Sequence, residues 1–133
     1  MSADNPHHGK PGPRVLVVDD NDVVRKTLAR TLQRLGYTAV EAASGEAALE
    51  VIAGDTATFD CMVIDRVMPG LSGPQLIRSI RAIDADVPIV LTTGFNDADE
   101  LPAGVVSSLL SKPWTTDDVK VVMRAALGQA AEE

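Results

Sequence analysis

The sequence lacks a second cysteine, a long apolar run and an excess of positive charge. The single Cys61 has no partner for an internal disulfide, so the fold must hold without one. Cys61 lies inside an apolar run, which is typical of a buried, unreactive thiol. No apolar stretch approaches the roughly 20 residues that a helix needs to cross a bilayer. We therefore expect a cytoplasmic protein without a membrane segment.

Positive charge is scarce, because 12 Lys and Arg face 19 Asp and Glu, for a net charge of −7. Nucleic acids and anionic membranes both repel an acidic protein. The charge balance therefore predicts that neither is a direct partner.

The chain has enough apolar residues for a core, since they make up 45 % of its 133 residues. This length and composition predict one folded domain. Residues 1–13 are rich in Pro, Gly and polar residues, and we expect them to be a disordered tail. The folded domain is expected over residues 14–128, with a short tail over residues 129–133.

Short apolar runs alternate with segments whose apolar residues recur at helical spacing. Helices are indicated after Asp22 by Val24, Leu28, Leu32 and Leu35, with Gly36 as the stop. Others are expected from Ser44 to Gly54, from Gly73-Pro74 through Ile83, and from the Thr115 or Thr116 cap. The run at 96–101 predicts one or two helical turns before Pro102. Strands are expected at 14–19, 38–43, 61–65, 87–93 and 105–111.

Five alternations of strand and helix predict a parallel α/β sheet with helices on both faces. Right-handed crossovers and a compact sheet favour the doubly wound order 2-1-3-4-5. In that order, the ligand crevice lies at the carboxyl ends of the first and third strands.

Polar residues stand at the carboxyl ends of four of these strands. Asp19 and Asp20 end the first strand and Asp65 ends the third, so three carboxylates meet in the crevice. Such a cluster is costly without a cation, and carboxylates with water suit Mg²⁺. Thr93 adds a hydroxyl and Lys112 an ammonium at the next two strand ends. Singly, each has a structural explanation, such as a helix N-cap for Asp20; together they predict a functional site.

The motifs that carry these residues resemble the receiver domain of two-component response regulators. They are "VVDDND" at 17–22, D-x-x-M-P-G-x-x-G from Asp65 to Gly73, Thr93-Gly94, and "KPW" at 112–114. The resemblance covers residues 14 to about 127, and the order and spacing of the motifs are more specific than any one of them. It implies the flavodoxin/CheY-like form of the doubly wound sheet.

The resemblance also implies roles for individual residues. Asp65 would be the phosphoacceptor, a carboxylate nucleophile that forms an acyl phosphate. Asp20 would bind Mg²⁺ directly, Asp19 mostly through water, and Val67 through its backbone carbonyl. The residues expected around the phosphoryl group are Lys112, Thr93, Gly94, Arg66 and Val67, and Pro113 would follow a cis peptide bond.

The partner implied by the resemblance is a sensor histidine kinase or a histidine phosphotransfer protein. It is expected to dock beside Asp65, near Asp22, Val23, Val24 and Thr27. Output would run through protein–protein contacts, and the chain would be no enzyme beyond self-catalysed phosphotransfer onto its own Asp65.

Three positions depart from the family pattern. Leu109 stands where the family usually carries Tyr or Phe, so the switch through Thr93 would run with a leucine in place of a ring. The segment from Thr93 to Lys112 is about one helical turn shorter than in familiar receivers, which predicts a short or irregular helix there. Val67 and Phe95 are apolar and cannot orient an attacking water, so slow self-dephosphorylation is expected.

Several readings of the whole chain remain open. It is a stand-alone receiver or relay intermediate, the excised receiver of a longer regulator or hybrid kinase, or a phosphorylation-independent interaction module. A phosphatase with an aspartyl nucleophile ranks lower, because the run from Asp65 to Pro69 lacks the second acid of the D-x-D-x-T pattern.

Overall fold

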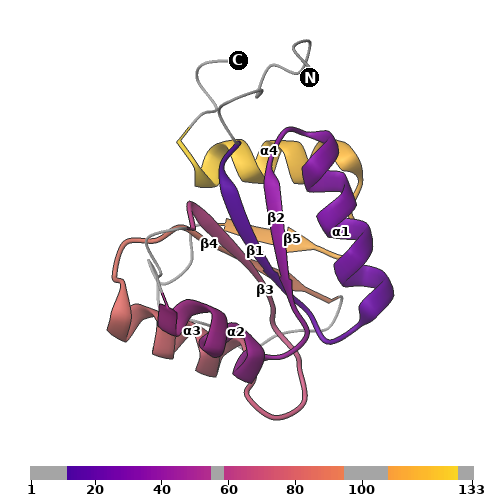
Figure 1. Cartoon of the computed structure of the whole chain (residues 1–133). Helices are drawn as coiled ribbons and strands as arrows, with labels where there is room; N and C mark the ends of the chain where they lie inside the picture. The colour runs from indigo at the N-terminus through magenta and orange to yellow at the C-terminus, as the bar shows by residue number, and fades with distance from the viewer. Residues whose placement is uncertain (1–11, 55–58, 95–107, 129–133) are drawn as a thin grey trace.

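The computed structural model describes residues 12–54, 59–94 and 108–128. Their strands form one five-stranded sheet in the order β2-β1-β3-β4-β5, and every neighbouring pair is parallel (Figure 1). This confirms the predicted doubly wound architecture. The elements are β1 Arg14–Val18, α1 Asp22–Arg34, β2 Thr38–Ala42, α2 Gly45–Gly54, β3 Cys61–Asp65, α3 Gly73–Ile83, β4 Ile89–Thr93, β5 Ser108–Ser111 and α4 Thr116–Ala126.

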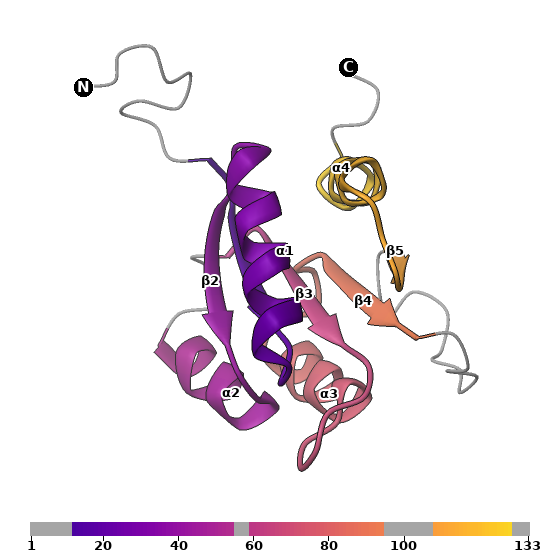
Figure 2. The ribbon, with the colours of Figure 1, turned by 90° about the vertical axis from the view of Figure 1, so that its right-hand side faces the viewer.

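Helices cover both faces of the sheet, α2 and α3 on one side and α1 and α4 on the other (Figures 1 and 2). Alternate side chains of each strand therefore enter two separate cores. In β3, Met62 and Ile64 pack towards α2 and α3, whereas Cys61 and Val63 pack towards α1 and α4. This double burial explains why the central strands are continuous apolar runs.

The helices begin at side-chain caps that hold otherwise unpaired backbone N–H groups. The Asn21 side chain accepts from the Val24 N–H at the start of α1, so the cap is Asn21 and the suggestion of Asp20 is wrong. Thr115, one of the two expected residues, caps α4. Gly36, with φ 102°, follows the end of α1 in a conformation that suits glycine, as the predicted stop requires.

Some predicted boundaries differ from the observed ones by a residue or two. β1 and β2 end one residue earlier than expected, and β4 begins at Ile89 because Pro88, which has no N–H, contributes only its carbonyl to Met62. Ile83 is the last residue of α3, as the predicted helix end required, and it is 56 % exposed.

Other predictions lie outside the described residues. These are residues 1–11 of the tail expected at 1–13, the tail at 129–133, the role of Phe95, the helical turns at 96–101, the shortened helix, and the first part of the strand expected at 105–111. Within the described part of the chain, no helix is both long enough and apolar enough to span a bilayer.

Candidate functional site at the carboxyl end of the sheet

Three carboxylates from two adjacent strands meet at the carboxyl end of the sheet. Asp19 and Asp20 follow β1, Asp65 ends β3, and one oxygen from each lies within 4.8 Å of the others. Asp19 and Asp65 are only 4 % and 5 % exposed, whereas Asp20 faces solvent. The predicted convergence of these three residues is therefore observed. Three hard oxygen donors with one side open to water suit a hexacoordinate Mg²⁺ that keeps several waters.

The charge of this cluster is only partly balanced by the protein. Burial raises the pKa of Asp19 above its ordinary value of 3.8, and the nearby Asp65 and Asp20 charges act in the same direction. The Asn21 N–H, which donates to Asp19 Oδ1 at 2.9 Å, and the Lys112 charge oppose that rise. The net direction is upward, so a carboxylate here is less stable than in water. A bound cation would remove that penalty.

Lys112 reaches into the cluster from the end of β5. Its Nζ lies 3.1 Å from Asp65 Oδ1, in a partly buried ion pair. Its backbone N–H donates to the Thr93 carbonyl at 2.8 Å, which ties the residue to the end of β4. The Lys112–Pro113 peptide bond is cis, as expected.

The hydroxyl that bonds Asp65 belongs to Thr92, which the sequence reasoning missed. Thr92 Oγ1 donates to Asp65 Oδ1 at 3.3 Å, and Thr92 is 2 % exposed. The cause is register: Asp65 pairs with Thr92 across β3 and β4, so both side chains point to the same face. Thr93, the residue that was predicted, lies next along β4 and is half-buried. Two adjacent threonines were visible in the sequence, but the pairing register was not.

Asp65 thus presents two different oxygens. Oδ1 accepts from both Lys112 and Thr92, whereas Oδ2 accepts no hydrogen bond from the described residues. One oxygen of the carboxylate is therefore anchored and the other is available to a ligand.

The loop after β3 brings the remaining predicted residues to the same end of the sheet. Arg66 is buried, Val67 is 59 % exposed, and Gly94 follows β4 and is half-buried. Gly73 is required where α3 begins, because a Cβ there would clash with the Asp65 carbonyl oxygen. Glu46 of α2 also holds this loop, since its Oε2 accepts from the Leu71 N–H at 3.2 Å.

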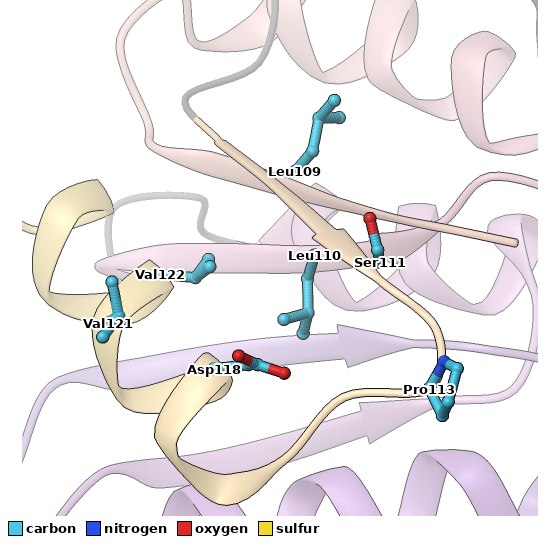
Figure 3. A pocket seen from close by; sticks show the side chains of 7 residues that line it. All are labelled: Leu109, Leu110, Ser111, Pro113, Asp118, Val121 and Val122. Carbon is cyan, nitrogen blue, oxygen red and sulfur yellow. The ribbon is translucent and has the colours of Figure 1, made fainter. Parts of the chain in front are cut away.

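Leu109, the expected switch residue, lies on β5 beside Leu91 of β4. In β5, Leu109 and Leu110 extend to opposite sides of the strand, and Leu109 is 58 % exposed (Figure 3). A surface hollow of about 350 Å³ lies between β5 and α4. Its lining residues are Leu109, Leu110, Ser111, Pro113, Asp118, Val121 and Val122.

A second hollow, of about 300 Å³, adjoins the carboxylate site through Lys112. It lies between the start of α1 and the loop that follows β5. Val23, which is 74 % exposed, contributes to it. The other lining residues are Val24, Thr27, Lys112, Pro113 and Trp114.

Comparisons with known proteins agree with this geometry. The family model described as "Response regulator receiver domain" matches residues 15–124. The chain is 38 % identical over 117 residues to the response regulator MprA of Mycobacterium ulcerans, covering 86 % of this chain and 50 % of that protein. It is 36 % identical over 116 residues to the sensor kinase CckA of Brucella abortus, covering 85 % of this chain and 12 % of that protein. The chain thus spans half or less of these two relatives.

Solved structures give the same result. A response regulator receiver protein from Pseudomonas putida superimposes with a TM-score of 0.74 at 33 % identity, covering 85 % of this chain and 96 % of that one. A receiver domain protein from Clostridium thermocellum has the same fold, with a TM-score of 0.82 at 24 % identity over 90 % of this chain and 98 % of that one.

Proposed function

This chain belongs to the family of response regulator receiver domains, and on that premise we propose that Asp65 accepts a phosphoryl group in a Mg²⁺-dependent reaction. As a receiver, the chain takes part in two-component phosphorelay signalling. The observation that carries the assignment of Asp65 is its position: a nearly buried carboxylate, held through Oδ1 by Lys112 and Thr92, beside two further aspartates.

Asp65 is suited to act as the nucleophile. A carboxylate needs no base to remove a proton at neutral pH, and Oδ2 accepts no hydrogen bond from the described residues. Attack by Oδ2 would form the acyl phosphate as the bond from phosphorus to the donor's nitrogen breaks. The donor's imidazole, already protonated on its other ring nitrogen, keeps the electron pair of that bond and leaves as the neutral ring. No residue of this chain donates or accepts a proton in this step.

Mg²⁺ would be held by the carboxylates of Asp19, Asp20 and Asp65 and by the Val67 carbonyl, and it would offset charge on the phosphoryl oxygens. Lys112 would pair with a phosphoryl oxygen in place of Asp65 Oδ1. Thr93 and the Gly94 N–H would bond another.

The donor is proposed to be a sensor histidine kinase or a histidine phosphotransfer protein that docks over the hollow at the start of α1. The exposed Val23 and the apolar residues around Trp114 form an apolar surface directly beside Lys112. Burying such a patch stabilises a complex, and its position brings the donor's histidine to the carboxylate cluster. The chain is proposed to be a signalling module rather than an enzyme, with its output through protein contacts.

Incubation with Mg²⁺ and acetyl phosphate, followed by intact mass measurement, tests the proposal. The protein is expected to gain one phosphoryl group, and Asp65→Asn is expected to gain none. Unmodified wild-type protein would contradict the assignment. Equal modification of wild type and Asp65→Asn would place the acceptor elsewhere.

The same assay distinguishes the two threonines. If Thr93 bonds the phosphoryl group, Thr93→Val should slow the reaction about tenfold, as expected for one lost hydrogen bond. A larger effect of Thr92→Val would transfer that role to Thr92.

The lifetime of the modification tests the role of the apolar Val67, which is 59 % exposed. We propose slow self-dephosphorylation, because a valine here cannot orient an attacking water. After removal of acetyl phosphate, the phosphoryl mass should persist well beyond seconds. Substituting Val67→Asn, which can bond a water, should shorten it.

A further inference from the structure

A buried arginine lies next to the acidic cluster, and neither the motifs nor the proposed chemistry uses it. Arg25, in the first part of α1, is 6 % exposed. A buried cation costs free energy unless its donors are paired. The hydrogen-bond partners of Arg25 therefore indicate its role.

Each of the three guanidinium nitrogens of Arg25 has its own acceptor. Nε donates to Glu41 Oε1 at 2.9 Å, and Nη2 donates to Asp22 Oδ1 at 2.7 Å. Nη1 donates to the backbone carbonyl oxygen of Asp19 at 2.9 Å. Burial alone would lower the pKa of Arg25, but the bonds to Asp22 and Glu41 raise it, so the group stays charged. One side chain thus joins β2, the start of α1 and the loop after β1.

The carbonyl that Arg25 holds belongs to the peptide between Asp19 and Asp20. Rotation of that peptide changes the direction of the Asp20 side chain relative to that of Asp19. The other contacts of the loop act elsewhere: the Asp19 N–H donates to the Ala42 carbonyl at 3.2 Å, and Asp19 Oδ1 accepts from the Asn21 N–H. The contact from Arg25 therefore acts on the geometry between the two aspartates.

We infer that Arg25 is a positioning residue for the cation site, and that it sets the relative directions of Asp19 and Asp20 by holding the peptide between them. The inference rests on the proposed Mg²⁺ site. Arginine suits the task because its planar fork donates in several fixed directions, whereas lysine carries one point charge that bonds from a single nitrogen. Glu41 supplies the anchor on β2.

If Arg25 is lost, its positioning role and its charge predict opposite changes in Mg²⁺ affinity. A positive charge near the cluster repels Mg²⁺, so removal of that charge alone would strengthen binding. Loss of the held geometry would weaken binding, as the loss of groups that orient metal ligands does by about 10- to 100-fold. The direction of the change therefore separates the two effects.

The test is an Mg²⁺ titration of the whole chain followed by amide NMR shifts. The variants are Arg25→Met, which removes charge and geometry, and Arg25→Lys, which keeps the charge. Arg30→Met is the matched control, because Arg30 is exposed on the same helix. We expect Arg25→Lys and Arg25→Met to weaken Mg²⁺ binding about tenfold or more, and Arg30→Met to leave it within about twofold. If Arg25→Met does not fold, Arg25→Lys decides.

A second readout excludes a general loss of structure. In the acetyl phosphate reaction, the Mg²⁺ concentration for half the maximal rate should rise in Arg25→Lys, while the rate at saturating Mg²⁺ stays near that of the wild type. A purely structural role would instead lower thermal stability and leave the Mg²⁺ affinity of the folded protein unchanged. Unchanged or tighter Mg²⁺ binding by Arg25→Lys would overturn the inference.

Failure of the inference can be told from failure of the proposed function. If the wild type binds Mg²⁺ but takes no phosphoryl group, the proposed function fails, and weaker Mg²⁺ binding by Arg25→Lys still supports the positioning role. If the wild type takes the phosphoryl group and Arg25→Lys binds Mg²⁺ equally well, only the inference fails. A wild type that binds no Mg²⁺ overturns both.

Discussion

Charged side chains have different surroundings at the two ends of the sheet. At the amino end, charged side chains close the turns of the chain itself. Arg81 Nη1 donates to the carbonyls of Val87 and Asp84 at 2.7 and 3.3 Å, and Asp84 Oδ1 accepts from the Val87 N–H. The Arg14 N–H donates to Asp60 Oδ2 at 2.8 Å. Each of these charged side chains is paired with backbone groups of the turns, so it contributes to stability.

At the carboxyl end of the sheet, negative charge exceeds the positive charge that pairs with it. Of the three clustered carboxylates, only Asp65 forms an ion pair with Lys112, and the pKa of Asp19 is raised by burial and by its acidic neighbours. The same residue types therefore stabilise one end of the fold and strain the other. Carboxylates with a raised pKa are found more often at functional sites than elsewhere, and the rest of the fold offsets their cost.

Removing the Lys112 ammonium at the carboxyl end of the sheet should change stability the most. Lys112→Met leaves Asp65 buried without its ion pair, so we expect a loss of about 2–3 kcal/mol in the free energy of unfolding without Mg²⁺. Urea unfolding measures it. Adding Asp65→Asn to the same chain should recover most of the loss. A double variant as unstable as Lys112→Met would mean that the ion pair is not the cause.

At the amino end of the sheet, the loss of Arg81 should lower stability without affecting the carboxylate cluster. Arg81→Met removes a donor from two carbonyls and should lower the free energy of unfolding by about 1–2 kcal/mol. Mg²⁺ binding, followed by amide NMR shifts, should not change. A change in Mg²⁺ affinity would show that the two ends of the sheet are energetically coupled.

The smallest effect should be a gain. Asp19→Asn keeps the acceptor for the Asn21 N–H but removes a disfavoured charge, so we expect about 1 kcal/mol more stability at pH 7 without Mg²⁺. Because the pKa of Asp19 is higher in the folded chain than its ordinary 3.8, its ionisation opposes folding above that raised value. The penalty fades as the pH falls through the raised pKa and is absent below 3.8.

Urea unfolding of Asp19→Asn at several pH values tests this sign. The gain should shrink towards acid pH, and Mg²⁺ should stabilise the variant less than the wild type. Glu50→Gln, which removes an exposed acid from α2, is the control for net charge alone. An equal gain from Glu50→Gln would assign the effect to overall repulsion rather than to the cluster.

Much of the fold could be predicted because the apolar pattern is local. The continuous run at Cys61–Asp65 indicates a strand buried on both faces, and it is one. Boundaries were less accurate where one backbone group decides them, as at Pro88, or where an amide competed with acids for a helix cap, as at Asn21. Leu109 fits the strand pattern, but its outward direction became clear only in the assembled sheet.

Some residues of the candidate site could likewise be predicted from the local pattern, and others could not. The local pattern was enough to predict which groups stand at strand ends, because a parallel sheet brings the ends of β1, β3, β4 and β5 to one edge whatever the details of packing. It placed Asp19, Asp20, Asp65 and Lys112 together correctly. The hydrogen bonds from Thr92 to Asp65 and from Arg25 to the Asp19 carbonyl depend on how the whole chain folds, and the sequence pattern did not predict them. Strand register and the path of a long side chain depend on contacts between segments far apart in sequence, and local pattern carries no record of them.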